Sequence, residues 1–442
     1  MLSFLGRRTG WNCDGLARRD FLRVGALGLG GLTLPALLRS KATAESVGRH
    51  TKDTSVVLLW LPGGPTHMDT YDLKPNAPSE YRGTFNPIKT HVSGIEICEL
   101  MPKQAQVMDK MCIIRSFYHT NAGHGGGTHW VMTGFDFPPA DSGEPQVYPS
   151  PGSVTARVRG NHPRTGMPPY VSLNRVYGDG PAYLGVASAP FEAGGQAKQN
   201  MSLAGGIDLT RIGDRRLLLK SFDELNRKLE ATGAVDGLND FEQQAFSLIL
   251  GKEAREAFDL TREDPRCRSR YTGSDGATQQ IGDLLLTSRR LCEAGAAFVT
   301  VAWNGWDDHG QIANAMRAKL PPLDHAVAAF VEDVSQRGMS DRIMLVIAGE
   351  FGRTPRINPG AGRDHWPTGS FAVVAGGGLK MGQVIGETTA KGEEPRSRRV
   401  TPQDLMATIY HVLAIDREMH FMNAAGRPTA IITDGKPIPE LV

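Results

Sequence analysis

Cysteine and net charge are both scarce in this sequence. Five cysteines are scattered over 442 residues with no C-x-x-C pair, which excludes a zinc ribbon and leaves isolated buried thiols as the expectation. Lysine and arginine number 49 against 47 aspartate and glutamate residues, so no excess of basic charge predicts nucleic-acid binding. No internal repeat, heptad array or low-complexity tract is present. What remains is an ordinary soluble composition, long enough for one large or two ordinary domains.

The first 44 residues have the features of a bacterial export signal. A twin-arginine pattern, RRDFLR, begins at Arg18 and precedes the uncharged run Val24–Leu38, which is too short to span a bilayer comfortably. An A-x-A cleavage site then ends at Ala44. We therefore expect export by the twin-arginine (Tat) machinery, cleavage of residues 1–44, and a periplasmic or secreted mature chain over 45–442 with no stable membrane span. The alternatives are a membrane anchor and a buried helix.

The mature chain alternates apolar runs with helical periodicity. The runs have the length and composition of buried strands in a parallel sheet, and they are Ser55–Leu61, Met111–Ser116, Pro169–Leu173, Ala297–Trp303, Arg342–Ala348 and Phe371–Ala375. Apolar residues at three- and four-residue steps predict helices over Asp214–Thr232, Leu238–Leu260, Thr278–Ala294, Pro322–Gln336 and Pro402–Leu413. The alternation predicts an α/β fold, a three-layer sandwich with a mostly parallel central sheet. We expect a helical insertion around 214–294 and a long surface excursion over Phe135–Pro169.

Acidic and histidine side chains follow several of the predicted strands. In open α/β sheets the carboxyl ends of the strands form the edge where ligands bind. His67 and Asp69 follow the first strand, and Asp69 is favoured as a metal ligand because it lies nearer the strand end than Asp72. Such groups suit a divalent cation, and neighbouring arginines suit an anionic oxyester. The alternative is a set of salt-bridged loops in which the aspartates cap turns. The corresponding side chains after the later strands are Asp307, His309, Glu350, Arg353, Arg363, Asp364 and His365.

A glycine-rich segment after Met111–Ser116 holds three of the twelve histidines of the chain, namely His119, His124 and His129. Glycine lets a ligand approach the backbone, and exposed amides at a helix N-terminus favour anions. The GGG sequence is not a P-loop, because no Gly-Lys-Ser/Thr follows it. Thr128 offers a hydroxyl within the same segment. The alternative is a flexible glycine loop with solvated histidines.

Five motifs together resemble a known family. They are G-G-P-T-H-M-D-T-Y-D-x-K-P, H-T-N-x-x-H, W-D-x-H-G, G-E-F-G-R-T-P and G-R-D-H-W, and they span nearly the whole mature chain. The set resembles the exported bacterial proteins called domain of unknown function 1501, which are placed in the alkaline phosphatase/sulfatase superfamily. The resemblance implies an alkaline phosphatase-like central sheet, mostly parallel, with helices on both faces and metal ligands at strand ends.

The resemblance also implies roles for individual residues. Asp69 takes the place of the acid after the first strand, and His365 takes that of the final histidine. Asp307 and His309 take the place of an Asp…His pair, although they are more closely spaced than usual. Glu350-Phe351-Gly352 resembles the Asp-His-Gly of the superfamily, so the loss of a metal histidine at Phe351 implies one metal site instead of two. Met132-Thr133-Gly134 looks like the Leu-Thr-Gly that ends the sulfatase nucleophile segment.

Counting back from Met132-Thr133-Gly134, His124 stands where a sulfatase has its formylglycine cysteine, so formylglycine chemistry is not expected. The sequence and the resemblance together predict an exported metal-dependent hydrolase of phosphate or sulfate esters, acting on a small-molecule or polysaccharide substrate. The cofactor is expected to be a divalent ion, Zn, Ca, Mg or Mn. The alternative is a non-catalytic pseudo-enzyme of the cell envelope that binds an anionic polysaccharide or a protein partner.

The expected metal ligands are Asp69, Asp307, His309, Glu350, Asp364 and His365. The expected catalytic residues are His124, Thr128 and Arg353, and for His124 the roles of nucleophile, more distant base and metal ligand all stay open. The expected substrate-binding residues are His67, His129 and Arg363.

Overall fold

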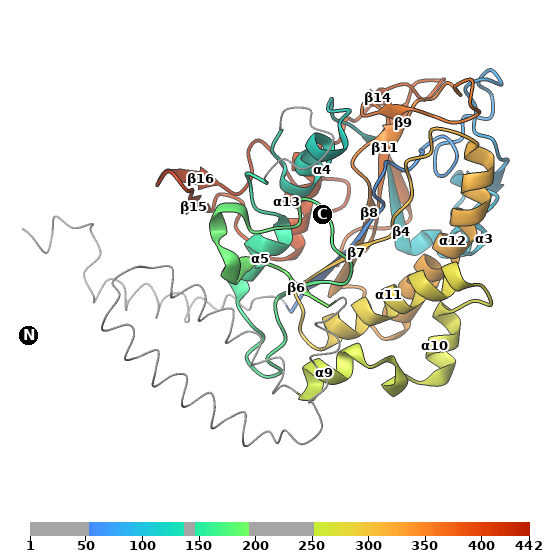
Figure 1. The fold of residues 1–442 in the computed structure, drawn as a ribbon. Coiled ribbons are helices and arrows are strands. Elements are labelled where there is room, and N and C mark those ends of the chain that lie inside the picture. Colours follow the sequence, from blue (N-terminus) through green and yellow to red (C-terminus); the bar gives the residue numbers. More distant parts are fainter. Residues whose placement is uncertain (1–52, 137–145, 194–251) are drawn as a thin grey trace, which may run out of the picture. The chain divides into compact units, whose positions relative to one another are not determined.

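An eight-stranded sheet runs through the part of the chain that the computed structural model describes, residues 53–136, 146–193 and 252–442 (Figure 1). All its strand pairs are parallel except those of β11 (Ser370–Gly376), which runs antiparallel to β4 (Met111–Phe117) and β8 (Ile343–Ala348). The predicted mostly parallel sheet is thereby confirmed. In spatial order the strands are β12 (Gln383–Ile385), β4 (Met111–Phe117), β11 (Ser370–Gly376), β8 (Ile343–Ala348), β1 (Ser55–Trp60), β7 (Phe298–Ala302), β5 (Tyr170–Ser172) and β6 (Phe191–Glu192).

The central strands are apolar on both sides, because helices cover both faces of the sheet. Successive side chains of a strand point to opposite faces, so Val57 and Leu59 of β1 join one buried cluster, and Val56 and Leu58 join another. On the first face lie α3 (Pro102–Gln106), α9 (Lys252–Phe258), α10 (Pro265–Tyr271), α11 (Gly276–Glu293) and α12 (Ile312–Gln336). On the second lie α4 (His124–Thr133), α5 (Pro151–Arg159) and α13 (Pro402–Val412). The expected three layers are present.

Local sequence signals explain where several helices begin. Thr401 and Asp404 form a reciprocal capping box at the start of α13, with Pro402 in the first turn. Asp275 accepts a hydrogen bond from Thr278 N and begins α11. The helices predicted for these two stretches are confirmed. The predicted start of α12 was wrong, because the helix begins at Ile312 and contains Pro321 and Pro322.

The remaining elements are short. Four two-stranded pairs occur in the described residues: β2 (Pro87–Lys89) with β3 (Glu96–Cys98), β9 (Gly352–Arg353) with β10 (His365–Trp366), β13 (Glu387–Thr388) with β14 (Pro395–Ser397), and β15 (His420–Met422) with β16 (Pro428–Ala430). Single 3-10 turns are η1 (Met108–Lys110), η2 (Ala182–Leu184), η3 (Val186–Ser188) and η4 (Leu260–Arg262).

Some expectations fall on other parts of the chain. The leader (1–44), the helix expected over Asp214–Thr232 and most of Leu238–Leu260 lie outside the described residues. The surface excursion expected over Phe135–Pro169 contains helix α5, whose first turn is capped by Ser150. The four cysteines in the described ranges are free and buried, as expected. No helix within those ranges is long and apolar enough to cross a membrane.

Candidate metal centre

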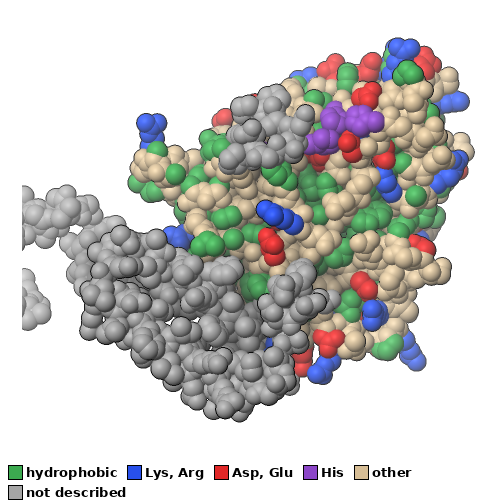
Figure 2. All heavy atoms as spheres, in the orientation of Figure 1, with side chains coloured by type: hydrophobic (Ala, Val, Ile, Leu, Met, Phe, Trp, Pro, Cys, Tyr) green, Lys and Arg blue, Asp and Glu red, His purple; other side chains and the backbone are tan. Residues whose placement is uncertain are grey.

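The carboxyl ends of three strands carry the histidines and acids that meet at one edge of the sheet. Asp307 and His309 follow β7, Glu350 follows β8, and His124 begins α4 after β4. Strands β4 and β8 both run antiparallel to β11, so they point the same way, and their carboxyl ends lie at the same edge. Histidine and acidic side chains gather there at the molecular surface (Figure 2).

A small ribbon brings His365 to this edge. The chain leaves β8, forms β9, turns and returns as β10, so that Arg353 pairs with His365 and Gly352 with Trp366. The ribbon is extended by a hydrogen bond from Thr354 N to the Asp364 carbonyl at 2.8 Å. The ribbon therefore places Arg353 and His365 side by side, although they are far from β7 in the sequence.

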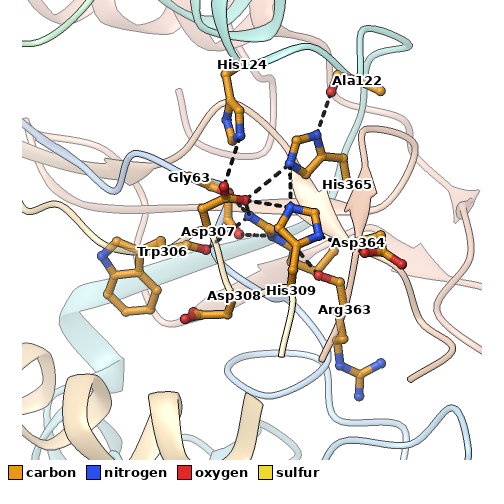
Figure 3. Close-up of polar contacts among 12 residues, drawn as sticks. Gly63, Ala122, His124, Trp306, Asp307, Asp308, His309, Arg363, Asp364 and His365 are labelled. Carbon is orange, nitrogen blue, oxygen red and sulfur yellow. Dashed lines mark hydrogen bonds and ion pairs between the residues drawn. The ribbon is translucent and has the colours of Figure 1, made fainter. Parts of the chain in front are cut away.

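Asp307 is the centre of the cluster (Figure 3). Its Oδ1 lies 3.0 Å from His309 Nε2 and 3.2 Å from His365 Nε2, and its Oδ2 lies 3.4 Å from His124 Nε2. The Nε2 atoms of His309 and His365 are 3.2 Å apart. Donor atoms of His124, Asp307 and His365 all lie within 4.8 Å of one another. The side chains of Asp307 and His309 are about half exposed, so solvent reaches the group.

The other nitrogen of each imidazole faces an acceptor. His124 Nδ1 lies 2.8 Å from Glu350 Oε1, and His309 Nδ1 lies 2.7 Å from Asp364 Oδ1. His365 Nδ1 lies 2.9 Å from the carbonyl oxygen of Ala122. An ionised carboxylate and a carbonyl can only accept, so each Nδ1 carries the proton and donates it. A ring that carries only this proton turns a bare Nε2 lone pair toward Asp307, whereas a ring protonated on both nitrogens donates to Asp307 through Nε2.

Arg353 lies beneath the cluster with no solvent exposure. Its guanidinium donates to Asp307 Oδ1 at 2.5 Å, to the Gly64 carbonyl at 2.9 Å and to the Gly63 carbonyl. Although burial opposes ionisation, the hydrogen bond and charge of Arg353, with smaller contributions from His365 and His124, lower the pKa of the Asp307 carboxyl to about 2. Arg353 thus keeps Asp307 charged and in place, and it offers no exposed donor to a substrate.

The histidine pKa values follow their partners. The hydrogen bond to Glu350 raises the pKa of His124, while burial lowers that of His365. The hydrogen bond from His309 lowers the pKa of Asp364. These directions favour an ionised Asp364 and a neutral His365.

The end of β1 contributes a backbone amide, that of Gly63, to the site. Gly63 has φ +113°, and a Cβ atom there would lie 2.3 Å from Asp307 N, so only glycine fits this close approach. The Gly63 amide donates to Glu350 Oε1 at 2.7 Å. The sequence pattern drew attention to the side chains after β1 and missed this amide.

Asp69 is not brought into the cluster. Its carboxylate is fully buried, and it accepts hydrogen bonds from Thr66 Oγ1 at 2.8 Å and Thr84 N at 2.8 Å. It forms an ion pair with Arg363, also fully buried, at 2.7 Å. The Arg363 side chain points away from the histidines (Figure 3). In this arrangement the two residues satisfy each other, and neither faces a metal ion or a substrate.

Three further expected site residues lie in other surroundings. His67 is buried, with Nε2 2.8 Å from the Gly392 carbonyl. His129 is buried in α4, where its Nδ1 lies 3.1 Å from the Phe135 carbonyl. Thr128 is buried on the same helix, and no hydrogen bond joins it to the cluster.

Several contributing groups were not expected from the sequence. His119 Nε2 donates to the backbone carbonyl of Glu350, and burial lowers the pKa of His119 to about 4. Asn358 Nδ2 donates to Asp364 Oδ1 at 3.2 Å and supports the His309 partner. The H-T-N-x-x-H motif contains both His119 and His124, so its first histidine was the sequence signal for the contact with Glu350.

The fold and the site define an α/β protein with a histidine/aspartate centre at the carboxyl edge of its sheet. Residues 53–442 match the model of the family described as "Protein of unknown function (DUF1501)", and the chain belongs to that family. The expected family membership is confirmed. No curated protein matches the sequence.

Similar solved structures share little sequence with the chain. The lipoteichoic acid synthase LtaP from Listeria monocytogenes is 9% identical, with a TM-score of 0.36 over 87% of this chain and 76% of that one. The PsFucS1 sulfatase from Pseudoalteromonas sp. is 12% identical, with a TM-score of 0.38 over 86% and 70%. The TAB5 alkaline phosphatase mutant is 10% identical, with a TM-score of 0.34 over 82% and 98%. Scores this low carry no conclusion about activity.

The donor set itself fits a metal ion. Three imidazole Nε2 lone pairs and one carboxylate converge, and each ring has the hydrogen-bond acceptor on its other nitrogen that metal-binding histidines almost always have. Without a positive species between them, the lone pairs of His309 and His365 would repel each other across 3.2 Å. His124, Asp307, His309 and His365 are therefore the groups that would hold the ion.

Proposed function

We propose that the chain is a metal-dependent hydrolase of phosphate or sulfate esters. One observation carries the proposal: three imidazole Nε2 atoms face a single half-exposed carboxylate at the carboxyl edge of a parallel sheet. That edge is the usual ligand site of α/β folds. A divalent ion bound there would polarise an ester oxygen and lower the pKa of a water molecule.

The residues of the chain supply position and charge. Asp307 brings one negative charge, which Arg353 fixes from below, and the three imidazoles are neutral ligands whose orientation is set by Glu350, Asp364 and the Ala122 carbonyl. A divalent ion would leave this group of ligands net positive, because only one anionic ligand faces it. A net positive centre open to solvent favours an anionic ester as substrate.

Export is part of the proposal. The RRDFLR pattern, the apolar run after it and the A-x-A site support Tat-dependent passage to the periplasm or beyond. The substrate would then be an extracytoplasmic ester, either a small molecule or a polysaccharide.

The test uses the mature chain, residues 45–442. Its metal content is measured by elemental analysis, and hydrolysis of phosphate and sulfate monoesters is followed with and without a chelator. We expect a bound divalent ion and turnover that the chelator removes and added metal restores. The proposal is overturned if no metal co-purifies or reconstitutes and every ester stays intact.

One observation favours a second candidate, a non-catalytic protein that binds an anionic polysaccharide. In the described ranges no hydroxyl or thiol side chain makes a hydrogen bond to His124, Asp307, His309 or His365. A metal-loaded protein that retains a sulfated glycan without hydrolysing it, even at high protein concentration, would establish this candidate and exclude the hydrolase.

A further inference from the structure

Two carboxylates expected to bind metal directly instead stand behind histidines. Glu350 Oε1 already accepts hydrogen bonds from Gly63 N at 2.7 Å and His124 Nδ1 at 2.8 Å. Asp364 Oδ1 accepts from His309 Nδ1 at 2.7 Å and Asn358 Nδ2 at 3.2 Å. The donor atoms that all lie within 4.8 Å of one another belong to His124, Asp307 and His365 and include neither carboxylate. His309 also lies outside that group, but its Nε2 is 3.0 Å from Asp307 Oδ1 and 3.2 Å from His365 Nε2. Among the residues that the structure describes, Asp307 is the side-chain carboxylate that faces the three Nε2 atoms.

The resulting ligand set is rich in nitrogen and poor in oxygen. Ca²⁺ takes about 6–8 oxygen ligands, and Mg²⁺ prefers an octahedron of oxygens and waters. Zn²⁺ and Co²⁺ accept several imidazoles with one carboxylate and leave a position for water or substrate. The Glu350 side chain is buried, and its Oε2 has no hydrogen-bond partner. If Glu350 bound the ion directly, it would do so through this oxygen.

We infer that the centre takes a zinc-class ion (Zn²⁺ or Co²⁺) through the Nε2 atoms of three histidines. This inference rests on the proposed metal-dependent function. Glu350 and Asp364 act on the ion only through His124 and His309, by fixing the proton on Nδ1. They are positioning residues, and the ion contacts Asp307 and the imidazoles.

The first test needs no activity. In metal-free mature protein labelled with ¹⁵N-histidine, long-range ¹H–¹⁵N spectra at a pH high enough to leave each ring neutral report which ring nitrogen carries the proton. We expect Nδ1–H with a bare Nε2 for His124, His309 and His365, each assigned by the signal that its His→Gln variant removes. Nε2–H forms at His124 and His309 would overturn the inference, because the ligand atoms would then be blocked.

The second test separates the two roles of Glu350. Glu350→Gln keeps an acceptor for His124 Nδ1–H, whereas Glu350→Ala removes it. If Glu350 acts through His124, Zn²⁺ affinity measured by competition with a chelating dye falls about 10-fold in the first variant and about 100-fold in the second. Equal losses in both variants would make Glu350 a direct ligand and overturn the inference. Asp308→Asn is the matched control, because Asp308 is next to Asp307 but is paired with Lys319 at 2.5 Å.

The choice of ion is tested by calorimetry with Zn²⁺, Co²⁺ and Ca²⁺ on the same metal-free protein. We expect heat of binding with Zn²⁺ and Co²⁺, visible absorption from bound Co²⁺, and none of either with Ca²⁺. Binding of Ca²⁺ alone, together with ester turnover, would overturn the zinc-class inference while leaving the proposed hydrolase intact. Turnover that needs no metal would overturn the proposed function itself.

Discussion

The Arg353 guanidinium, fully buried, donates to Oδ1 of Asp307, whose side chain is 47% exposed, at 2.5 Å. The same guanidinium also donates to backbone carbonyls of Gly64 and Arg363 at 2.9 and 3.1 Å. One side chain therefore ties the turn after β1, the loop after β7 and the β9–β10 ribbon to the central carboxylate. The geometry of the centre depends on this arginine as much as on the histidines.

Replacing this arginine should damage both stability and the site. Arg353→Met leaves several buried carbonyls without a donor and removes the charge beside Asp307, so we expect a loss of about 3–5 kcal/mol in the free energy of unfolding. Metal affinity should fall as well, because Asp307 loses the buried donor that holds its carboxylate in place. Urea unfolding and metal titration measure the two effects. Arg356→Met, at an exposed arginine of the same loop, is the control and should change neither.

The buried pair of Asp69 and Arg363 predicts a loss of stability without a loss of metal affinity. Asp69→Asn leaves the Arg363 guanidinium as an uncompensated buried charge, so we expect a loss of about 3–5 kcal/mol of stability. Metal affinity of the folded fraction should stay unchanged, because neither residue faces the histidines. Urea unfolding and calorimetry with Zn²⁺ below the unfolding transition provide the two readouts. Loss of metal binding with stability retained would restore Asp69 as a ligand.

Much of the sheet could be predicted because its strands are buried on both faces. Runs such as Ser55–Leu61 and Arg342–Ala348 are continuous and apolar, and β1 and β8 lie within a residue of those bounds. Helix α4 was missed because HGGGTHW has poor helix propensity and no apolar periodicity. Its glycines fit tertiary contacts instead: a Cβ at Gly126 would lie 2.5 Å from the Asn121 side chain.

The site was predictable where motif and strand end coincide. Asp307, His309 and His365 were expected at the edge, and the structure brings them together. The role of Asp69 was not predictable, because its partner Arg363 is 294 residues away and no local pattern reports a pairing of that range. Arg353 and Arg363 look suited to an anionic substrate in the sequence. In the structure both are buried, and each is paired with an aspartate that lies far away in the chain.

Removal of the central charge should abolish metal binding without a change of shape. Asp307→Asn keeps the side-chain volume but lacks the anion that balances a divalent ion, so we expect ester hydrolysis to fall by more than about 100-fold. In wild type, free metal at about 100 times its Kd should add about 2.7 kcal/mol to the free energy of unfolding. The variant should gain none. Equal stabilisation of Asp307→Asn and wild type in urea unfolding with added Zn²⁺ would contradict the assignment.

Acid should weaken the fold through His119. This ring is buried and its pKa is lowered to about 4, below the ordinary value of 6.5. Between those two values the unfolded chain binds a proton that the native protein does not, so stability rises with pH across this window. As pH falls from about 6.5 to about 4 the protein should lose up to about 3 kcal/mol from this residue.

His119→Gln isolates that contribution, because glutamine can still donate to the Glu350 carbonyl and does not titrate. Free energies of unfolding are measured in urea from pH 4 to 8 for both proteins. The difference, wild type minus variant, should rise between pH 4 and 6.5 and stay flat above, since His119 is then neutral in both states. His411→Gln, at an exposed histidine, controls for the loss of a histidine as such. A difference that is flat over the whole range would mean that the folded ring takes up its proton at the same pH as the unfolded chain, which would contradict the lowered pKa of His119.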